Sequence, residues 1–378
     1  MDFGFSDEQE ALRQSAREVL ADRAGPVAYR AAMGSKSGTD DGLWKTVTEL
    51  GWSGVAIDEQ HGGLGLGLIE LTILMEETGR ALAPVPFFST VALAGPLLEQ
   101  ASGPSRDEGL RAIASSGARA TVALGQKDGR FDAAGVSVKA ARTESGWKFS
   151  GTASLVPDAH LADQIVVIAR TARSRNPEEG LSLFFVPAAA LKSKPKPQAS
   201  LDGNRRMADV KLGGVEVPAD ALLGEEGNAW PLVARALDRA AVLLAAEAVG
   251  VATATLDRAV AYARERTQFD RPIGSFQAIS HKCADMLLVT ETARSHVYYA
   301  AWALEEGAPD ARLAAATAKA AASDAARIVA NDSIQVHGGI GFTWEHDMHL
   351  FYRRAKFCEL FLGDASAWRE RVAAALVS

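Results

Sequence analysis

A guanidinium, an amide and a pair of glycines in the C-terminal half of the chain have the chemistry of a phosphate-binding site. Arg266 supplies a planar fork that can bind two phosphate oxygens at once. Gly338 and Gly339 follow the predicted end of a helix at His337, and without a Cβ they let backbone N–H groups approach a ligand closely. Gln335 adds a side-chain amide. Together these residue types predict a site for a diphosphate.

Arg266 belongs to the most informative stretch of the chain, Tyr262–Gln277. The stretch ends an alanine-rich helix, breaks at a proline and a glycine, and starts a second helix at Gln277. Taken singly, its residues have ordinary interpretations. Arg266 would form a surface ion pair, and Phe269 would anchor a core. Their joint spacing, Y-x-x-x-R-x-x-F-x-x-P-I-x-x-F-Q, favours a ligand site.

That spacing resembles a motif of the flavin-dependent acyl-CoA dehydrogenase family. Three further segments are similar to the family, namely Leu50–Arg80, Gln335–Glu345 and Tyr352–Lys356. The resemblance covers essentially the whole chain. It implies FAD as cofactor, an acyl-CoA thioester as substrate, and α,β-dehydrogenation as in fatty acid β-oxidation.

The resemblance also implies which residues hold the adenine and diphosphate half of FAD. They are Arg266, Phe269, Gln277, Gln335, His337, Gly338 and Gly339. In the relatives such groups reach across a subunit boundary to a neighbour's FAD. A homotetramer, or a heterotetramer with a sister dehydrogenase chain, is therefore expected, with electron-transfer flavoprotein as electron acceptor. His337 and His346 have no partners at metal-ligand spacing, so no metal is expected.

The catalytic base of the family is missing. Removing a proton from the acyl Cα requires a carboxylate beside the thioester. In the family this is a Glu at one of two positions. Counted from Lys356 of the last motif, the first position falls on Leu362. Counted back from Arg266, the second falls on Ala240, so neither position carries an acid.

Three other acids are candidates for the base, and each has a structural alternative. Glu247 lies two turns beyond Ala240, near the same face of the helix, but it would equally suit a buried partner of an arginine. Asp364 lies close to Leu362, but it would equally suit a helix terminus. Asp238 would equally cap the long helix or pair with an arginine.

The segments expected at the flavin ring also depart from the family. The Thr-Glu-Pro…Gly-Ser-Asp loop of the relatives corresponds here to Ala123–Asp132, and the Trp-Ile-Thr that shields the ring corresponds to Ser154–Asp158. The adenine end of the site is kept and the ring end is lost. Three functions stay open: a dehydrogenase with a relocated base, the non-catalytic subunit of a heteromeric dehydrogenase, and a non-enzymatic scaffold of the same fold.

Three zones of different hydrophobic period would position these groups. Residues 1–117 predict helices, 118–228 short strands and 229–378 long apolar helices. We therefore expect an α+β protein of the acyl-CoA dehydrogenase fold, with an N-terminal α-helical domain, a middle antiparallel β-barrel and a C-terminal four-helix bundle. The predicted strands are Ala120–Leu124, Val136–Val138, Trp147–Ser150, Gln164–Ala169, Leu181–Val186 and Asp209–Leu212. The main predicted helices are Leu68–Arg80, Trp230–Arg266, Phe276–Glu306, Pro309–Gly338 and Trp344–Leu362.

The composition limits the partners and the compartment. The 378 residues carry a formal net charge of −7, which makes nucleic acid an unlikely partner. Two cysteines without CxxC spacing fit a reducing compartment. No signal-peptide core is recognisable, and no apolar stretch is predicted to span a membrane. These features predict a cytoplasmic protein.

Overall fold

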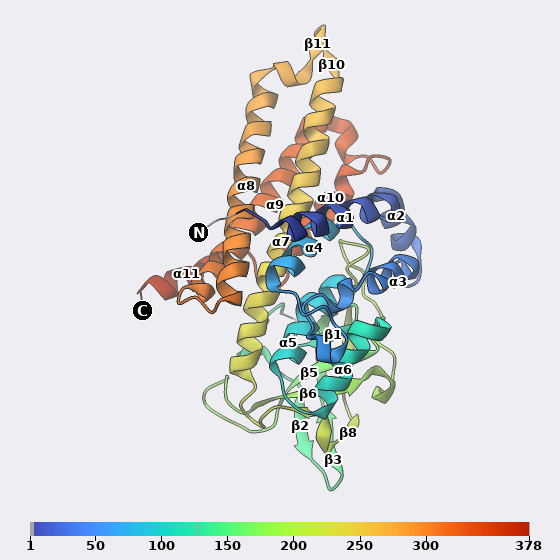
Figure 1. Cartoon of the computed structure of the whole chain (residues 1–378), viewed down its shortest axis with the longest axis vertical. Coiled ribbons are helices and arrows are strands. Elements are labelled where there is room, and N and C mark those ends of the chain that lie inside the picture. Colours follow the sequence, from blue (N-terminus) through green and yellow to red (C-terminus); the bar gives the residue numbers. More distant parts are fainter. Residues whose placement is uncertain (1–3, 127, 378) are drawn as a thin grey trace. The chain divides into compact units, whose positions relative to one another are not determined.

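The computed structural model describes residues 4–126 and 128–377, and the predicted order of helices, strands and helices is confirmed (Figure 1). The first helices are α1 Asp7–Arg23, α2 Pro26–Gly34, α3 Asp41–Glu49, α4 Leu68–Arg80, a π-helical segment Phe88–Ala94, α5 Gly95–Gln100 and α6 Pro104–Ser116. The strands that follow are β1 Ala120–Ala123, β2 Lys139–Arg142, β3 Gly146–Ser150, β4 Thr152–Pro157, β5 Gln164–Arg170, β6 Leu181–Pro187, β7 Met207–Lys211, β8 Glu216–Pro218 and β9 Leu222–Leu223. The last elements are α7 Trp230–Glu265, β10 Thr267–Gln268, β11 Arg271–Pro272, α8 Gln277–Glu305, α9 Ala311–His337, α10 Met348–Leu360 and α11 Ala365–Val377.

The chain packs as two compact units. The first comprises 1–31, 68–84 and 241–378, and the second comprises 32–67 and 85–240. Secondary structure changes type near the expected limits, because β1 begins at Ala120 and α7 at Trp230. The compact units follow a different division, so the three-domain organisation stays a prediction.

The first unit is built from α1, α4, the C-terminal part of α7, and α8 to α11. Its long helices carry alanine and valine on their packed faces, which lets neighbouring helices approach closely. The apolar cluster between α7, α8 and α9 contains Ala252, Leu256, Ala259, Ala263, Met286, Val329 and Val336. Helices α4 and α7 approach each other closely. A Cβ at Gly79 would overlap the carbonyl oxygen of Glu247, and a Cβ at Gly250 would overlap that of Glu76.

The second unit contains the sheets. Its larger sheet has the order β8-β3-β2-β5-β6-β9, with β1 also paired to β5, and β4 pairs separately with β7. Both sheets share one apolar core, in which Trp147 and Phe149 pack edge-on against Phe184 at 5.1 Å between ring centroids. The expected barrel is thus built, within the described residues, as two sheets around a common core.

Two details of the strand prediction were wrong. The sheet is mixed and not wholly antiparallel, because β1 pairs with β5 in parallel. Val136–Val138 is not a strand. Only the carbonyl of Val138 joins the sheet, accepting from the Arg170 N–H at 2.8 Å, and the regular strand β2 begins one residue later.

Helix α7 departs from the expectation that no segment is long and apolar enough to cross a membrane. It is the one helix in the described ranges that passes that test by length and composition. However, 89% of its most apolar stretch is buried inside the structure. A core helix of a folded protein has this pattern, so the finding is weak evidence for a membrane span.

Candidate functional site

The predicted diphosphate-binding arginine lies at the tip of a helical hairpin. Strands β10 and β11 join the ends of α7 and α8, at the top of Figure 1. The backbone of Arg266 is fixed on both sides. Its N–H donates to the Tyr262 carbonyl at 2.8 Å, and its carbonyl accepts from the Ile273 N–H at 2.8 Å. The guanidinium is left exposed at the end of this fixed backbone.

Phe269 is not a core anchor. Its side chain is 86% exposed at the tip of the hairpin, and its ring lies edge-on to Phe276 with centroids 6.1 Å apart. The Arg271 guanidinium covers the Phe276 ring at 4.0 Å. An exposed aromatic beside cationic groups is a surface suited to stacking and to anion binding.

The other predicted FAD contacts are exposed too. Gln277 is the first residue of α8, and Gln335 lies in the last turn of α9. Gly338 has φ 64°, and a Cβ built on it or on Gly339 would have no neighbour within 4 Å. Among residues 4–126 and 128–377, the side chains of Arg266, Gln277 and Gln335 have no hydrogen-bond or ion-pair partner. The backbone at the glycines is therefore open to a ligand.

His337 differs from the rest of the set because its contacts lie within the chain. It is 5% exposed, and its Nδ1–H donates to the Ser333 carbonyl at 2.7 Å. The ring stacks on Tyr262 with centroids 4.4 Å apart. Burial lowers the pKa of His337, which favours the neutral form of the imidazole.

The stacking of Tyr262 on His337 brings the two motifs together. Tyr262 lies one turn before Arg266 on α7, and His337 directly precedes Gly338 at the end of α9. The guanidinium and the open glycine backbone are thus positioned at the same end of the first unit. This arrangement has the donors that a diphosphate requires.

Neither base position carries an acid in the folded chain. Ala240 is fully buried in α7, and Leu362 is 5% exposed in the turn between α10 and α11. Glu247, seven residues after Ala240 on α7, is also fully buried, and the Arg354 Nη1 donates to its Oε1 at 2.8 Å. This contact favours the structural alternative, a buried carboxylate that compensates an arginine.

Of the other two candidates, Asp364 occupies a structural position and Asp238 is buried within α7. Asp364 is exposed and begins α11, where its Oδ1 accepts from the Ala367 N–H at 2.9 Å, as a helix cap does. Asp238 is 4% exposed within the first turns of α7. Arg354 was not predicted as the partner of Glu247, although it stands in the Tyr352–Lys356 motif.

The segments expected at the flavin ring lie in the second unit. Ala123–Asp132 continues from the end of β1 into a loop, of which Lys127 lies outside the described residues. Ser154–Asp158 overlaps β4 and its bulge, with Leu155 at φ 55° and Asp158 at φ 53°. Gln126 and Ser154 from the two segments line one open cavity of about 490 Å³.

Asp158 is held inside the second unit. Its carboxylate accepts from the Ser89 hydroxyl at 2.8 Å, and its N–H donates to the Arg206 carbonyl at 2.8 Å. Asp158 is 4% exposed. A buried carboxylate thus stands in the segment where the relatives have an aromatic shield.

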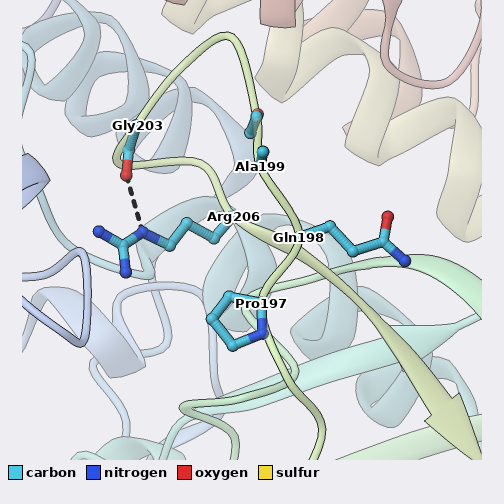
Figure 2. A pocket seen from close by; sticks show the side chains of 6 residues that line it. Pro197, Gln198, Ala199, Gly203 and Arg206 are labelled. Atoms are coloured by element: carbon cyan, nitrogen blue, oxygen red, sulfur yellow. Dashed lines mark hydrogen bonds between the residues drawn. The ribbon is translucent and has the colours of Figure 1, made fainter.

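The arginine that lines a second hollow of the same unit already donates its hydrogen bonds within the protein. It measures about 320 Å³ and lies beside the loop Pro197–Gly203. Figure 2 shows the Arg206 guanidinium directed toward the Gly203 carbonyl and the Gln198 side chain extending away from it. Arg206 also donates to the carbonyls of Met33, Ser35 and Lys36 at 2.8–2.9 Å. With four backbone acceptors, this arginine fixes a loop and is not available to an anion.

Comparison with known proteins decides the family. The sequence matches the acyl-CoA dehydrogenase N-terminal domain over residues 6–116 and the acyl-CoA dehydrogenase C-terminal domain over residues 227–377. The chain belongs to the acyl-CoA dehydrogenase family. It is 35% identical to the acyl-CoA dehydrogenase IpdE2 of Mycobacterium tuberculosis over 350 residues, which cover 92% of this chain and 91% of IpdE2.

Solved structures of acyl-CoA dehydrogenases match along the whole chain. Butyryl-CoA dehydrogenase from Megasphaera elsdenii has a TM-score of 0.93 at 27% identity, and the match covers 100% of both chains. A chain of the ChsE4–ChsE5 complex from Mycobacterium tuberculosis has a TM-score of 0.90 at 28% identity, covering 100% of this chain and 99% of that one. The expected fold is therefore confirmed.

As a member of the acyl-CoA dehydrogenase family, the chain serves FAD-dependent α,β-dehydrogenation of acyl-CoA thioesters. FAD, when bound, takes up the hydride that leaves Cβ. The residues present fit its adenine and diphosphate half, because Arg266 and Gln335 offer exposed donors and the backbone at Gly338 is open.

Proposed function

We propose that this chain is the subunit of a heteromeric acyl-CoA dehydrogenase that does not carry the catalytic base. The observation that carries the proposal is the absence of an acid at both family positions, occupied here by Leu362 and Ala240. The engagement of Glu247 by Arg354 supports it, because a base must be free to take up a proton.

The exposed hairpin gives the second argument. In this proposal Arg266, Gln277, Gln335 and the backbone of Gly338 and Gly339 contact the FAD of a sister chain, and the sister supplies the base and the ring contacts. Side chains that serve a neighbouring subunit are exposed when the chain is considered alone. The ChsE4–ChsE5 complex is a two-chain relative of this fold, which makes such an arrangement reasonable for this chain.

The remaining partners follow from the same proposal. The substrate is an acyl-CoA thioester whose chain length this chain's sequence does not specify. Electron-transfer flavoprotein is the proposed acceptor of the electrons from the reduced FAD. The assembly is a heterotetramer, and the cytoplasm is its proposed compartment.

The first test is the flavin content of the chain purified alone and after co-expression with a sister chain that carries Glu at either base position. The proposal predicts apoprotein for the single chain, even after added FAD, and a flavin-loaded assembly after co-expression. About one FAD per chain in the single protein would overturn it. That outcome would point to a stand-alone enzyme with a relocated base.

A matched pair of variants tests the hairpin within the co-expressed assembly. Arg266→Ala should weaken FAD retention. Arg264→Ala, an equally exposed arginine of the last turn of α7, should leave it unchanged. Equal FAD retention in both variants would show that Arg266 does not hold the diphosphate.

A further inference from the structure

A lysine in the middle of α9 is buried, and no carboxylate of residues 4–126 or 128–377 is bound to it. Lys319 has no exposed surface, and its Nζ donates to the carbonyl oxygens of Cys358, Glu359 and Gly363 at 2.9, 3.2 and 3.0 Å. The Ser323 hydroxyl lies 2.8 Å from the same nitrogen. The ammonium thus bridges α9 to the end of α10 and to the turn that follows.

The ammonium form of Lys319 can donate more hydrogen bonds in this site than the neutral amine, although burial disfavours its charge. An ammonium has three N–H donors, and three backbone carbonyls accept from it. A neutral amine has two donors, so at least one carbonyl would lose its bond. Two of the acceptors end α10, where the negative pole of the helix dipole favours a cation. The number of hydrogen bonds that Lys319 can donate to this turn therefore depends on whether its side chain is protonated.

The turn that Lys319 holds has an unusual backbone. Leu362 has φ 62° and Gly363 has φ 103°. A leucine in the left-handed region is strained, and such strain persists only where the surroundings enforce it. A second donor enforces it here, because the Trp368 Nε1–H donates to the Leu362 carbonyl at 3.0 Å. Lys319 and Trp368 hold the turn from two sides.

We propose that Lys319 is a positioning residue, whose ammonium fixes residue 362 in its strained conformation and releases it when the proton is lost. The functional role of Lys319 rests on the proposed function, in which Leu362 occupies the position of the family's base. The position carries a leucine in place of a carboxylate, and its backbone is held by Lys319 and Trp368. Residue 362 then meets the thioester end of a ligand in one fixed conformation.

Other groups near Lys319 bear on its titration. Burial lowers the pKa of Lys319 to about 8, while Cys358 and Glu359 of α10 and Asp364 at the start of α11 oppose that shift. Because thiols in general ionise in a similar pH range, the contribution of Cys358 must be separated from that of Lys319 by mutation. Ser323 on α9 does not titrate.

The first experiment is hydrogen exchange of the protein in whichever form it is purified with flavin, alone or with a sister chain, followed by mass spectrometry. In Lys319→Met, exchange of the peptide covering 358–364 should rise about tenfold or more, as expected for the loss of charge-assisted bonds worth about 1.5–3 kcal/mol. The peptide covering 262–276 is the internal reference. Ser323→Ala removes the hydroxyl and keeps the three carbonyl bonds, so it should change exchange little. Unchanged exchange in Lys319→Met would overturn the proposal.

The second experiment uses Trp368 as a reporter of the turn, since its indole binds the Leu362 carbonyl directly. With 5-fluorotryptophan incorporated, the ¹⁹F signal that disappears in Trp368→Phe should titrate between pH 7 and 9. The titration should persist in Cys358→Ala and vanish in Lys319→Met. A purely structural lysine would give no titration, and a titration lost in Cys358→Ala would assign it to the thiol. Either result would overturn the proposal.

If the Lys319→Met variant does not fold, the unmodified protein still allows the proposal to be tested. Exchange at 358–364 in the unmodified protein, corrected for the intrinsic pH dependence of amide exchange, should then accelerate as the pH passes about 8. No acceleration would overturn the proposal. Flavin content, which tests the heteromeric function, does not enter these readouts, so the two proposals fail separately.

Discussion

The exposed and the buried polar groups of the first unit differ in whether their side chains are hydrogen-bonded within the protein. At the hairpin end, Arg266, Gln277 and Gln335 are exposed and make no side-chain hydrogen bond to the rest of the described chain. In the interior, Glu247 is bound by Arg354, and Lys319 is surrounded by carbonyls. The difference separates groups that stabilise this fold from groups that are presented to another molecule.

The contrast has a physical basis. A buried charge without a partner is expensive, so interior polar groups must be satisfied within the fold. An exposed arginine is satisfied by water and is free to exchange water for a ligand. Mutations at the two places should therefore act on different quantities, on folding stability in the interior and on cofactor retention at the hairpin.

The largest effect is expected from breaking the interior ion pair. Arg354→Met leaves the Glu247 carboxylate buried without this partner and should lower the free energy of unfolding by about 3–5 kcal/mol. Urea denaturation followed by far-ultraviolet circular dichroism measures it. The double variant Glu247→Leu/Arg354→Met should recover most of the loss, because it removes both charges. A double variant as unstable as the single one would contradict this account.

The next effect comes from the helix crossing in the same interior. Gly250→Ala places a Cβ against the Glu76 carbonyl and should destabilise the protein by about 1–3 kcal/mol, because α4 and α7 must separate. Gly34→Ala is the matched control, since its Cβ would meet nothing within 4 Å. Thermal denaturation of both variants decides whether the crossing is as close as the backbone indicates.

The pH dependence of stability should reveal Lys319. Its pKa is about 8 in the folded chain and near 10.5 when unfolded. Between these values the unfolded state binds more protons, so this group makes stability rise with pH. Below about pH 8 both states are protonated and the full burial penalty remains. Relative to Lys319→Met, the protein should gain stability from pH 8 to pH 10, as measured by urea denaturation at each pH. A relative loss over that range would contradict the assignment.

At the hairpin, in contrast, a mutation should change FAD binding and leave folding stability almost unchanged. Arg266→Ala should change the free energy of unfolding by less than about 0.5 kcal/mol, because the side chain is exposed. In the flavin-loaded assembly the same change should weaken FAD binding about tenfold or more, as loss of a charge-assisted bond worth about 1.5–3 kcal/mol implies. A stability loss without flavin loss would place Arg266 among the structural groups.

The sequence predicted helices better than the details of the sheets. Periodicity placed α4 at its observed limits, Leu68–Arg80, because apolar spacing and a following proline mark both ends. It could not predict that β1 would pair with β5 in parallel, since pairing depends on residues far apart in sequence. Helix α11 was missed, because its buried surface comes mainly from Trp368 and its amphipathic pattern is weak.

The FAD-binding role of the predicted residues stays a prediction, and the structure tests only their placement. The family resemblance predicted that Arg266 and Gly338 serve one site, and the stacking of Tyr262 on His337 positions both residues at one end of the unit. Nothing in the sequence around Lys319 distinguished it from a surface lysine on an alanine-rich helix. Its role depends on three carbonyls from another helix and a turn, which no local pattern encodes.

The tip of the hairpin is a place where stability and recognition are in conflict. Phe269 and Asp270 form its two-residue loop with φ of 53° and 61°, a conformation that Asn-Gly adopts with much less strain. Exchanging them for Asn and Gly should relax the loop and stiffen the isolated chain, while removing the aromatic ring from the surface. Selection for thermal stability alone would favour that exchange. Under the proposed function, the resulting protein would be more stable as an isolated chain and would bind its partner's FAD less well.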